Sequence, residues 1–195
     1  MKILHTADWH IGKKLHKHDL FPDFDLFINW LCSCIQENKI ELLLISGDVF
    51  DLANPSSDAR KQYYKALLKL RNLDCKIILT GGNHDSPAML DAPGEILREL
   101  EMHVVGSLRE NIEDCIIPIK GKSGETELVV AALPYLRDAD LRSAADGNTY
   151  EDRLEAIRMG IQKTFENAAD LCKEKHAMIP AIAMGHLYAA GVETS

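Results

Sequence analysis

The chain has 195 residues, of which 46% are hydrophobic and 27% are charged, and this is the composition of an ordinary globular protein. Collagen-like, disordered and low-complexity classes are therefore excluded. The chain carries 22 lysines and arginines against 30 aspartates and glutamates, which gives a formal net charge of −8. An overall basic character, typical of nucleic-acid-binding domains, is absent, so charge alone argues against DNA as a ligand.

No apolar run approaches the ~20 residues that a membrane span needs. Residues 1–8 lack the apolar core and the small-residue cleavage site of a signal peptide. We therefore expect a cytoplasmic protein that makes no contact with a membrane. The five cysteines are odd in number and contain no CxxC pair, which favours reduced and mostly buried thiols over a zinc site or a disulfide framework.

Short apolar runs alternate with amphipathic stretches in the first half of the chain, a pattern typical of an α/β domain. In chain order, the pattern predicts a strand over 2–6, a helix over 23–39, a strand over 41–46, a helix over 57–70, a strand over 76–80 and a helix from 86 to about 101. The last helix is predicted to begin at Ser86-Pro87, a good N-cap followed by a proline in the first turn.

The second half predicts a different arrangement. We expect a short strand over 103–106, a hairpin of strands 114–119 and 127–133 with its turn at 121–124, a polar loop over 137–148, a helix over 150–175 and a strand over 178–184. Parallel units followed by a hairpin predict an α/β fold with two packed mixed β-sheets flanked by helices. Neither an internal repeat nor a linker interrupts the pattern.

Polar clusters directly follow four of the predicted strands. The clusters are Asp8-Trp9-His10, Gly47-Asp48-Val49-Phe50-Asp51, Gly81-Gly82-Asn83-His84-Asp85 and Gly185-His186. Open α/β sheets bind their ligands at the carboxyl ends of strands. Core packing explains the apolar strands but not four polar clusters at the same end, so these clusters predict a functional site.

The residue types in these clusters fit a site for two divalent metal ions. Carboxylate and imidazole groups suit Mn, Fe or Zn. The expected ligands are Asp8, His10, Asp48, Asn83 and His186, and the two oxygens of Asp48 allow it to bridge both ions. Two ions about 3.5–4 Å apart can activate a water and neutralise charge during an in-line displacement at phosphorus.

His84 follows a predicted ligand directly but is not needed as one. Its expected catalytic role is to contact the scissile phosphate, where it stabilises charge or protonates the leaving oxygen. Asp51 is expected to orient His84. Asp85 either assists this group locally or caps the turn before Ser86.

Four other residues near the clusters receive structural or open interpretations. Trp9 either packs beneath the site, which we favour, or contacts substrate, and His5 is expected to be structural because it lies within the first strand. His16 and His18 belong either to a basic loop near DNA phosphates or to an ordinary solvated loop.

The four motifs Asp-x-His, Gly-Asp-x-x-Asp, Gly-Asn-His-Asp and Gly-His occur in an order that resembles the calcineurin-like metallophosphoesterases. Longer stretches resemble the SbcD-type branch, the nuclease subunits of bacterial SbcCD complexes. These stretches are HTADWHIGKKL (5–15), ISGDVFD (45–51), PYL (134–136) and GHLYAAG (185–191). The resemblance runs from residue 2 to about 194.

The resemblance implies a four-layer αββα metallophosphoesterase fold and Mn-dependent hydrolysis of DNA in end processing, recombination, replication and repair. The implied activities are 3′ to 5′ exonuclease action on duplex ends and endonuclease action on single strands and hairpins. It assigns metal roles to Asp8, His10, Asp48, Asn83 and His186, and the catalytic role to His84. The implied partners are DNA, the SbcC ATPase and a second copy of the chain, through helices near 57–70 and 88–101.

The family also carries a later Gly-His-x-His motif, which supplies one histidine to each metal, and this motif does not occur before Ser195. We therefore expect an incomplete nuclease domain over 1–195, truncated at its C-terminal side, without the cap domain and the SbcC-binding segment. The hypothesis that follows is weak metal binding and little or no nuclease activity from this chain alone. Metal identity stays open among Mn, Fe, Zn, Co and Mg.

Two alternatives come from other functional classes. Another metallophosphoesterase is possible, either a phosphatase or a cyclic-nucleotide phosphodiesterase. In phosphoprotein phosphatases, Gly-Asp-x-x-Asp is usually followed by Arg-Gly, and Gly-Asn-His is usually followed by Glu. In this chain, Leu52-Ala53 follows the first motif and Asp85 follows the second. Cyclic-nucleotide enzymes share Gly-Asn-His-Asp, so only the matches in the flanking stretches argue against them. The third class is a non-catalytic dimerisation module.

Overall fold

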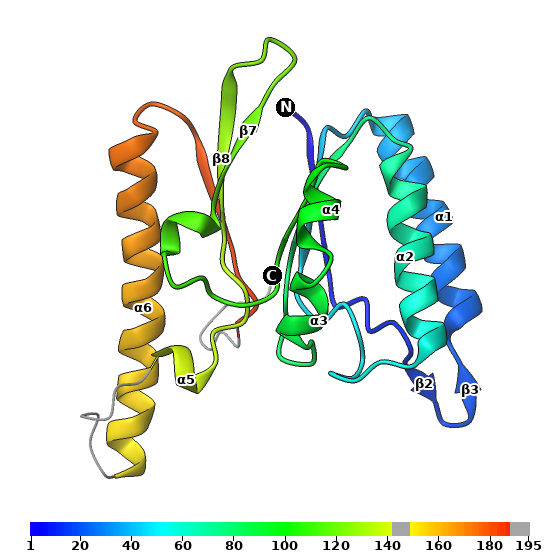
Figure 1. Cartoon of the computed structure of the whole chain (residues 1–195), viewed down its shortest axis with the longest axis horizontal. Helices are drawn as coiled ribbons and strands as arrows, with labels where there is room; N and C mark the ends of the chain where they lie inside the picture. The colour runs from blue at the N-terminus through cyan, green and yellow to red at the C-terminus, as the bar shows by residue number, and fades with distance from the viewer. Residues whose placement is uncertain (142–148, 188–195) are drawn as a thin grey trace, which may run out of the picture.

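The computed structural model describes residues 1–141 and 149–187, and their elements are arranged in four layers. Figure 1 shows a helical layer beside one sheet, a second sheet beside the first, and a long helix on the far side. The helical layer contains α1 (Phe21–Asn38), α2 (Ser57–Arg71), α3 (Pro87–Asp91) and α4 (Gly94–Arg98), and the long helix is α6 (Tyr150–Lys175). The predicted αββα fold class is confirmed.

The two sheets differ in strand direction. The first has the order β1-β4-β5-β6, and all of its neighbouring strands are parallel. Its strands are β1 (Ile3–Ala7), β4 (Leu42–Ser46), β5 (Lys76–Thr80) and β6 (Met102–Val105). The second has the order β7-β8-β9, with β7 (Ile116–Lys120) antiparallel to β8 (Thr126–Ala132) and β9 (Ala181–Met184) parallel to β8. The structure refines the prediction of two mixed sheets, since the first is parallel throughout.

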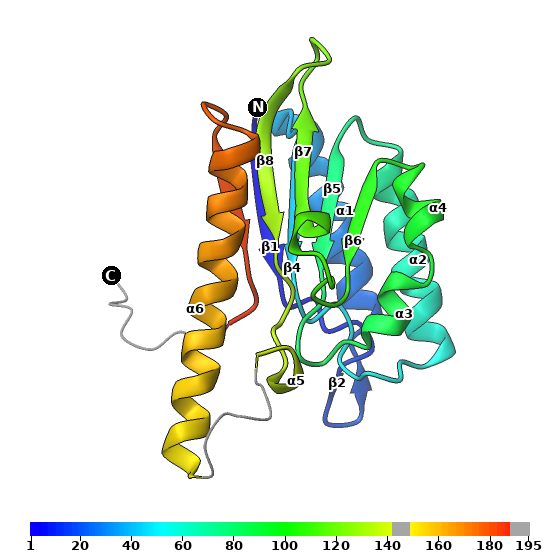
Figure 2. The same cartoon turned by 60° about the vertical axis from the view of Figure 1, so that its left-hand side comes forward.

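Two apolar cores hold the layers together, and the central strand β4 contributes to both. Leu43 and Ile45 face the helical layer, whereas Leu42 and Leu44 face the second sheet. This alternation follows from the two-residue period of a strand. All five residues of β4 are buried, as expected for a parallel strand covered on both faces. Figure 2 shows α6 covering the outer face of the second sheet.

The predicted helix over 86–101 is wrong as a single element, because it is divided into α3 and α4. Pro93 lies between them and is the N-cap residue of α4. Proline has no backbone N–H and its ring clashes with the preceding turn, so a continuous helix cannot pass through it. The proline was visible in the sequence.

Three smaller differences concern short elements. The predicted strand over 178–184 begins at Ala181, because Met178 has a left-handed φ of 74° and belongs to a turn. Residues 14–19 form an unpredicted hairpin of β2 (Lys14–Leu15) and β3 (His18–Asp19). A 3-10 helix, η1 (Ile112–Cys115), precedes β7, and α5 (Asp138–Leu141) occupies the start of the predicted polar loop, whose remaining residues 142–148 lie outside the described part.

The cysteines are reduced, but fewer of them are buried than expected. All five cysteines are free thiols, with Cys115 and Cys172 buried and the other three partly buried. Among the described residues, no helix has both the length and the apolarity to cross a bilayer.

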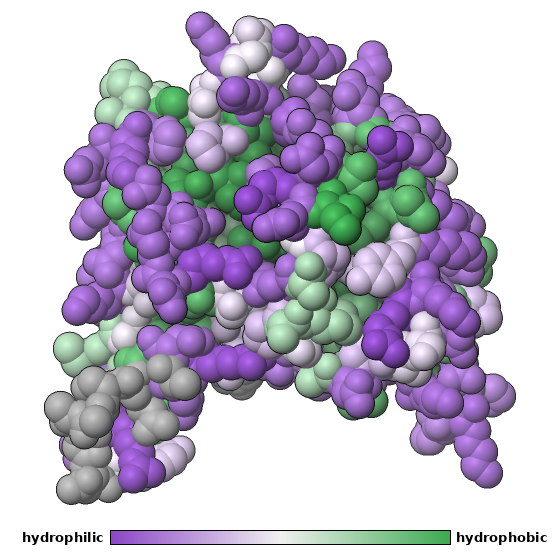
Figure 3. All heavy atoms as spheres, in the orientation of Figure 1, coloured by the Kyte–Doolittle hydropathy of each residue, from purple (hydrophilic) through white to green (hydrophobic). Residues whose placement is uncertain are grey.

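The face shown in Figure 3 is mostly hydrophilic, with an apolar patch over α4. Ile96 of α4 is 70% exposed, and Leu68 of α2 is 61% exposed. Single exposed apolar side chains are common on protein surfaces, whereas a contiguous patch of them marks a surface that another molecule can cover.

The buried hydroxyl of Tyr63 generates a prediction about stability. Tyr63 is 1% exposed, and its hydroxyl has no hydrogen-bond partner among the described residues. Burial, above all, raises the pKa of this phenol. Tyr63→Phe is expected to increase the free energy of unfolding in urea by about 1 kcal/mol, because it removes an unsatisfied buried polar group. Its neighbour Tyr64 is half-exposed, so Tyr64→Phe is the matched control with no expected change. A less stable Tyr63→Phe variant would contradict the prediction.

Candidate metal centre

The loops that follow β1, β4 and β5 are joined by backbone hydrogen bonds at one edge of the first sheet. His10 N donates to Asp48 O at 2.9 Å, so the loop after β1 extends the parallel ladder with the loop after β4. Gly47 N donates to Thr80 O at 3.0 Å, which holds the loop after β4 against the end of β5. The end of β9 adds His186 from the second sheet. The four predicted clusters therefore meet in space.

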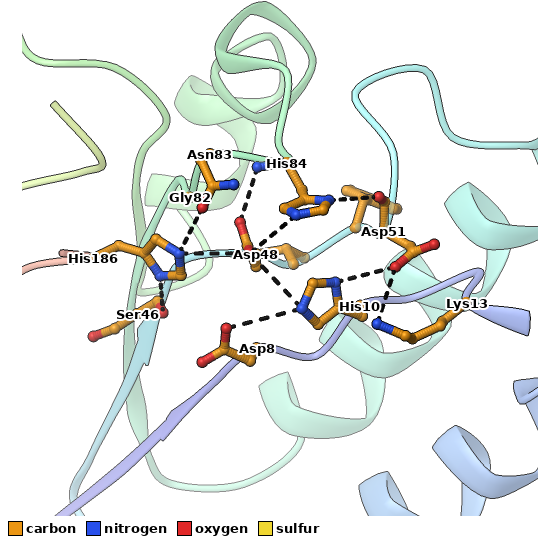
Figure 4. Close-up of polar contacts among 12 residues, drawn as sticks. Asp8, His10, Lys13, Ser46, Asp48, Asp51, Gly82, Asn83, His84 and His186 are labelled. Carbon is orange, nitrogen blue, oxygen red and sulfur yellow. Dashed lines mark hydrogen bonds and ion pairs between the residues drawn. The ribbon is translucent and has the colours of Figure 1, made fainter. Parts of the chain in front are cut away.

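The carboxylate of Asp48 lies at the centre of this group (Figure 4). Asp48 is 4% exposed, and its Oδ1 accepts a hydrogen bond from His84 N at 2.9 Å. Its Oδ2 faces the Nε2 atoms of three imidazoles, at 3.7 Å from His10, 3.9 Å from His84 and 3.5 Å from His186. These separations exceed the usual hydrogen-bond length of about 2.7–3.2 Å. The buried carboxylate is thus surrounded by nitrogen atoms that it does not hydrogen-bond.

His186 presents a lone pair to the site. Its Nδ1 lies 3.2 Å from the carbonyl oxygen of Ser46, which can only accept, so Nδ1 carries the hydrogen. In the neutral imidazole, Nε2 then has no hydrogen, and it lies 3.1 Å from Oδ1 of Asn83. Two acceptor atoms face one another there, an arrangement that a shared cation would stabilise.

The carboxylate of Asp51 lies behind the ring of His10. Its Oδ1 is 3.2 Å from His10 Nδ1, but the geometry does not make a hydrogen bond, and Nδ1 is buried without a hydrogen-bond partner among the described residues. The other ring nitrogen, Nε2, lies 3.9 Å from Asp8 Oδ1 and 3.7 Å from Asp48 Oδ2. A carboxylate behind a metal-ligating imidazole is the usual means of fixing its tautomer and orientation.

His84 is supported by the backbone of Asp51, not by its carboxylate. His84 Nδ1 lies 2.9 Å from the carbonyl oxygen of Asp51, so this nitrogen carries the hydrogen. Nε2 is left pointing toward Asp48, and the side chain is 43% exposed. The predicted link between Asp51 and His84 therefore exists through the main chain, and the carboxylate of Asp51 lies at His10.

Three predicted ligands have unusual backbone conformations. Asp8, His10 and Asp48 have φ values of 56°, 43° and 47°, in the left-handed region. Such conformations cost about 1–3 kcal/mol each and cluster at functional sites. They are tolerated better by aspartate and histidine than by most residues.

A family model described as Calcineurin-like phosphoesterase matches residues 1–191. The chain belongs to the calcineurin-like phosphoesterase family. The motif order that indicated this family is thereby confirmed.

Curated relatives of this calcineurin-like chain are named as the SbcD subunit of the SbcCD nuclease. The protein from Rhodobacter capsulatus is 37% identical over 98% of the chain, that from Escherichia coli K12 is 30% identical over 100%, and that from Bacillus subtilis is 28% identical over 98%. The matched part covers 49%, 48% and 48% of these relatives. The chain thus spans about half the length of the curated relatives it matches, and the resemblance to SbcD is confirmed.

The donor atoms fit divalent cations. Members of this phosphoesterase family use divalent metals, and two groups of described side chains have ligand atoms close enough to hold an ion. One group is Asp8, His10 and Asp48, and the other is His10, Asp51 and His84. Oxygen and imidazole donors without thiolates suit Mn, Fe or Zn. Asn83 and His186 converge on the opposite side of Asp48, as Figure 4 shows.

Asp85 has a larger structural role than its place in the sequence indicated, and it is 1% exposed. Its Oδ2 accepts from Gly82 N at 2.8 Å and from Val49 N at 3.0 Å, and its Oδ1 accepts from Phe50 N at 2.9 Å. Burial raises the pKa of this carboxyl, and the three backbone N–H groups oppose the rise. Asp85 therefore caps its own turn, as one interpretation expected, and also ties that turn to the loop after β4.

Two residues after β8 were not predicted to support the site. Arg137 Nη2 donates to the carbonyl oxygen of Asp85 at 2.9 Å, and Tyr135 N donates to Gly81 O at 2.8 Å. The ring centroid of Tyr135 lies 6.3 Å from that of His186. The match of PYL (134–136) to the family was the sequence signal that this segment matters. The contacts that it makes with the site depend on how the two sheets pack.

The remaining expectations concern peripheral residues. Trp9 is buried, and its ring packs edge-on against Phe24 at 5.6 Å, as predicted. His5 Nε2 contacts Ser46 Oγ at 3.0 Å, which agrees with a structural role. His16 and His18 are exposed in the β2–β3 hairpin. Residues 188–191 of the family match lie outside the described residues.

Gly82 generates a prediction about the assembly of the site. A Cβ at this position would lie 2.1 Å from both the backbone nitrogen and Oδ1 of Asp48. Gly82→Ala is expected to lower the free energy of unfolding by about 1–3 kcal/mol, because the Asp48 loop must move. Calorimetry should also show weaker Mn²⁺ binding. Gly94 has no atom within 4 Å of such a Cβ, so Gly94→Ala is the control, and equal behaviour of the two variants would refute the proposed close packing.

Proposed function

We propose that this chain forms the catalytic part of a metal-dependent DNA phosphodiesterase of the SbcD type. The observation that carries the proposal is the convergence of three imidazole Nε2 atoms on the buried carboxylate of Asp48. Its relatives are named nuclease subunits, and the chain spans about half of their length. The proposed reaction is hydrolysis of a DNA phosphodiester, with two divalent ions, most simply Mn²⁺, as cofactors.

The ligands divide into two sets that share Asp48. Asp8 and His10 would hold one ion, and Asn83 and His186 would hold the other. When bound, the ions supply an activated water and positive charge that stabilises the transition state at phosphorus. The carboxylate of Asp51, 3.2 Å from His10 Nδ1, would favour a hydrogen on that nitrogen and so leave Nε2 free to act as a ligand.

His84 has the geometry of a proton donor. Its Nδ1 hydrogen is engaged by the carbonyl of Asp51, and its Nε2 faces the space above Asp48. The protonated ring can stabilise the negative charge of a phosphoryl oxygen and give its Nε2 proton to the departing oxygen. The exposure of the side chain leaves it accessible to a substrate and to solvent protons.

The proposed substrates are DNA ends and hairpins, with 3′ to 5′ exonuclease action on duplexes and endonuclease action on single strands. The proposed partner is the SbcC ATPase, and the proposed location is the cytoplasm.

Lys13 and Lys14 lie near the site but are partly neutralised, since Lys13 Nζ is 3.6 Å from Asp51 and Lys14 Nζ is 3.0 Å from Asp19. Phosphate contacts would therefore depend strongly on the metal ions.

The resemblance implies two further histidine ligands in a Gly-His-x-His motif. With five ligand residues in the chain, we propose that it binds metal weakly and turns over slowly by itself. Metal binding is accordingly measured separately from hydrolysis in the test that follows.

The test compares the unsubstituted chain with Asp48→Asn and His84→Gln. Asp48→Asn should weaken Mn²⁺ binding, measured by electron paramagnetic resonance of free Mn²⁺, because it removes the shared ligand. His84→Gln should bind Mn²⁺ with nearly unchanged affinity but lose the slow cleavage of a DNA oligonucleotide that the unsubstituted chain should show when protein is in excess over DNA, as expected for loss of a general acid. Equal cleavage by His84→Gln, or faster hydrolysis of a cyclic nucleotide than of DNA, would contradict the proposal.

We also propose that the chain forms a homodimer through α2 and the α3–α4 segment. Leu68 of α2 and Ile96 of α4 are exposed apolar side chains, and the α4 patch is visible in Figure 3. Burial of such side chains against a second copy is favourable by about 25 cal/mol for each Å² of apolar surface.

The dimer is tested by light scattering on size-exclusion fractions. The double variant Leu68→Glu/Ile96→Glu should shift the mass from dimer to monomer, because it places charges in the apolar contact. Leu26 of α1 is similarly exposed, at 67%, but lies outside the proposed contact. Leu26→Glu should leave the dimer intact, and a dimer that survives the double variant would disprove this interface.

A further inference from the structure

A pocket of about 360 Å³ lies directly beside the candidate metal centre. It is bounded by the loop after β1 and by the beginning of α1, and Asp8 and His10 line it. The same two residues are predicted metal ligands, so the pocket and the metal centre are continuous. A ligand that fills the pocket would therefore touch the site of chemistry.

The walls of the pocket are aromatic and firmly held. Trp9, Phe24 and Phe27 contribute to its lining. The Trp9 ring lies 5.6 Å from Phe24 and 6.0 Å from Phe27, in edge-to-face arrangements, and its Nε1 donates to Thr6 Oγ1 at 3.2 Å. These contacts fix the rings without the help of a ligand, so the pocket is formed in advance. Trp9 and Phe24 are each 8% exposed, and the partly buried Phe27 is the more accessible ring of the three.

The charged groups around the pocket are one lysine and two aspartates. Lys13 lines it with a side chain that is 52% exposed and lies 3.6 Å from Asp51, and Asp8 and Asp23 line it as well. Without metal the lining is therefore acidic, and metal ions held by Asp8 and His10 would supply positive charge on the side where a phosphate would lie. With those ions the pocket would combine aromatic surface with adjoining positive charge, the combination by which proteins hold unpaired bases of nucleic acid strands.

We propose that this pocket receives one unpaired nucleobase, from the nucleotide next to the scissile phosphate. This inference rests on the proposed nuclease function and adds the form of DNA that the site accepts. The volume lies at the low end of the range for small-molecule sites, which suits a single base and its sugar. A base must leave its stack to enter, so ends with frayed or unpaired bases are the preferred substrates.

The binding test uses Trp9 as the reporter. The chain contains two tryptophans, Trp9 and Trp30, and Trp30 is exposed on α1. In a Trp30→Phe background, Trp9 fluorescence is titrated with thymidine 5′-monophosphate and with 2-deoxyribose 5-phosphate, in the presence of Mg²⁺. Thymidine 5′-monophosphate should quench the emission and bind at least about tenfold more tightly, since stacking adds affinity for the base.

Two variants test the pocket itself. Phe27→Leu keeps an apolar wall but removes an aromatic face, and Leu20→Trp places a bulky ring in the lining. Both should abolish the preference for thymidine 5′-monophosphate while leaving the affinity for 2-deoxyribose 5-phosphate unchanged. Leu20→Trp adds a tryptophan, so its affinities are measured by calorimetry, and thermal melting confirms that both variants are folded.

The outcomes separate this inference from the proposed function. Equal affinity for the two ligands, or a base preference that survives both variants, would overturn the base pocket even if Mn²⁺-dependent cleavage of DNA is observed. Base-dependent quenching without any cleavage would instead support the pocket and count against the proposed function. Failure of both ligands to change Trp9 emission or to bind by calorimetry would overturn the pocket.

Discussion

The buried carboxylate of Asp48 is the group on which the rest of the site depends. Taking a carboxylate out of water is unfavourable unless hydrogen bonds or cations compensate. One oxygen of Asp48 is satisfied by the backbone of His84, and the other faces three imidazole nitrogens beyond hydrogen-bond distance. The carboxylate therefore lies where the neighbouring imidazoles do not hydrogen-bond to it. A divalent cation would compensate it there, and the left-handed backbone of Asp48 is a conformation of the kind that clusters at functional sites.

The fold positions these groups by bringing strand ends together. The parallel order of β1, β4 and β5 places three loops side by side, and the second sheet delivers His186 from the end of β9. Asp85 then ties the turn after β5 to the loop after β4 through three backbone hydrogen bonds. Stability and function are linked at this point, because the bonds that hold the loops together also hold the candidate ligands in place.

Local patterns predicted most of this arrangement, and long-range contacts account for what they missed. The apolar run of β4 and the polar residues that follow each strand were sufficient to place five candidate ligands at one edge. The contact of Asp51 with His10 and the three bonds of Asp85 depend on how distant loops pack, so spacing in the sequence could not assign them. The division of the helix at Pro93 is a different case, because the signal was local and was overlooked. The hairpin at residues 14–19 has strands of two residues each, too short for any periodicity to be detected.

Net charge was the least informative property of the sequence. A total of −8 argues against DNA, yet part of that charge is concentrated at Asp8, Asp48 and Asp51, where bound cations would reverse its sign locally. The central claim is that at least one divalent metal ion binds beside Asp48. A crystal structure of the chain with Mn²⁺, with anomalous data collected at the manganese edge, tests this claim most directly. The account predicts anomalous density next to Asp48 on its His10 side, its His186 side or both, and density only at other places would contradict it.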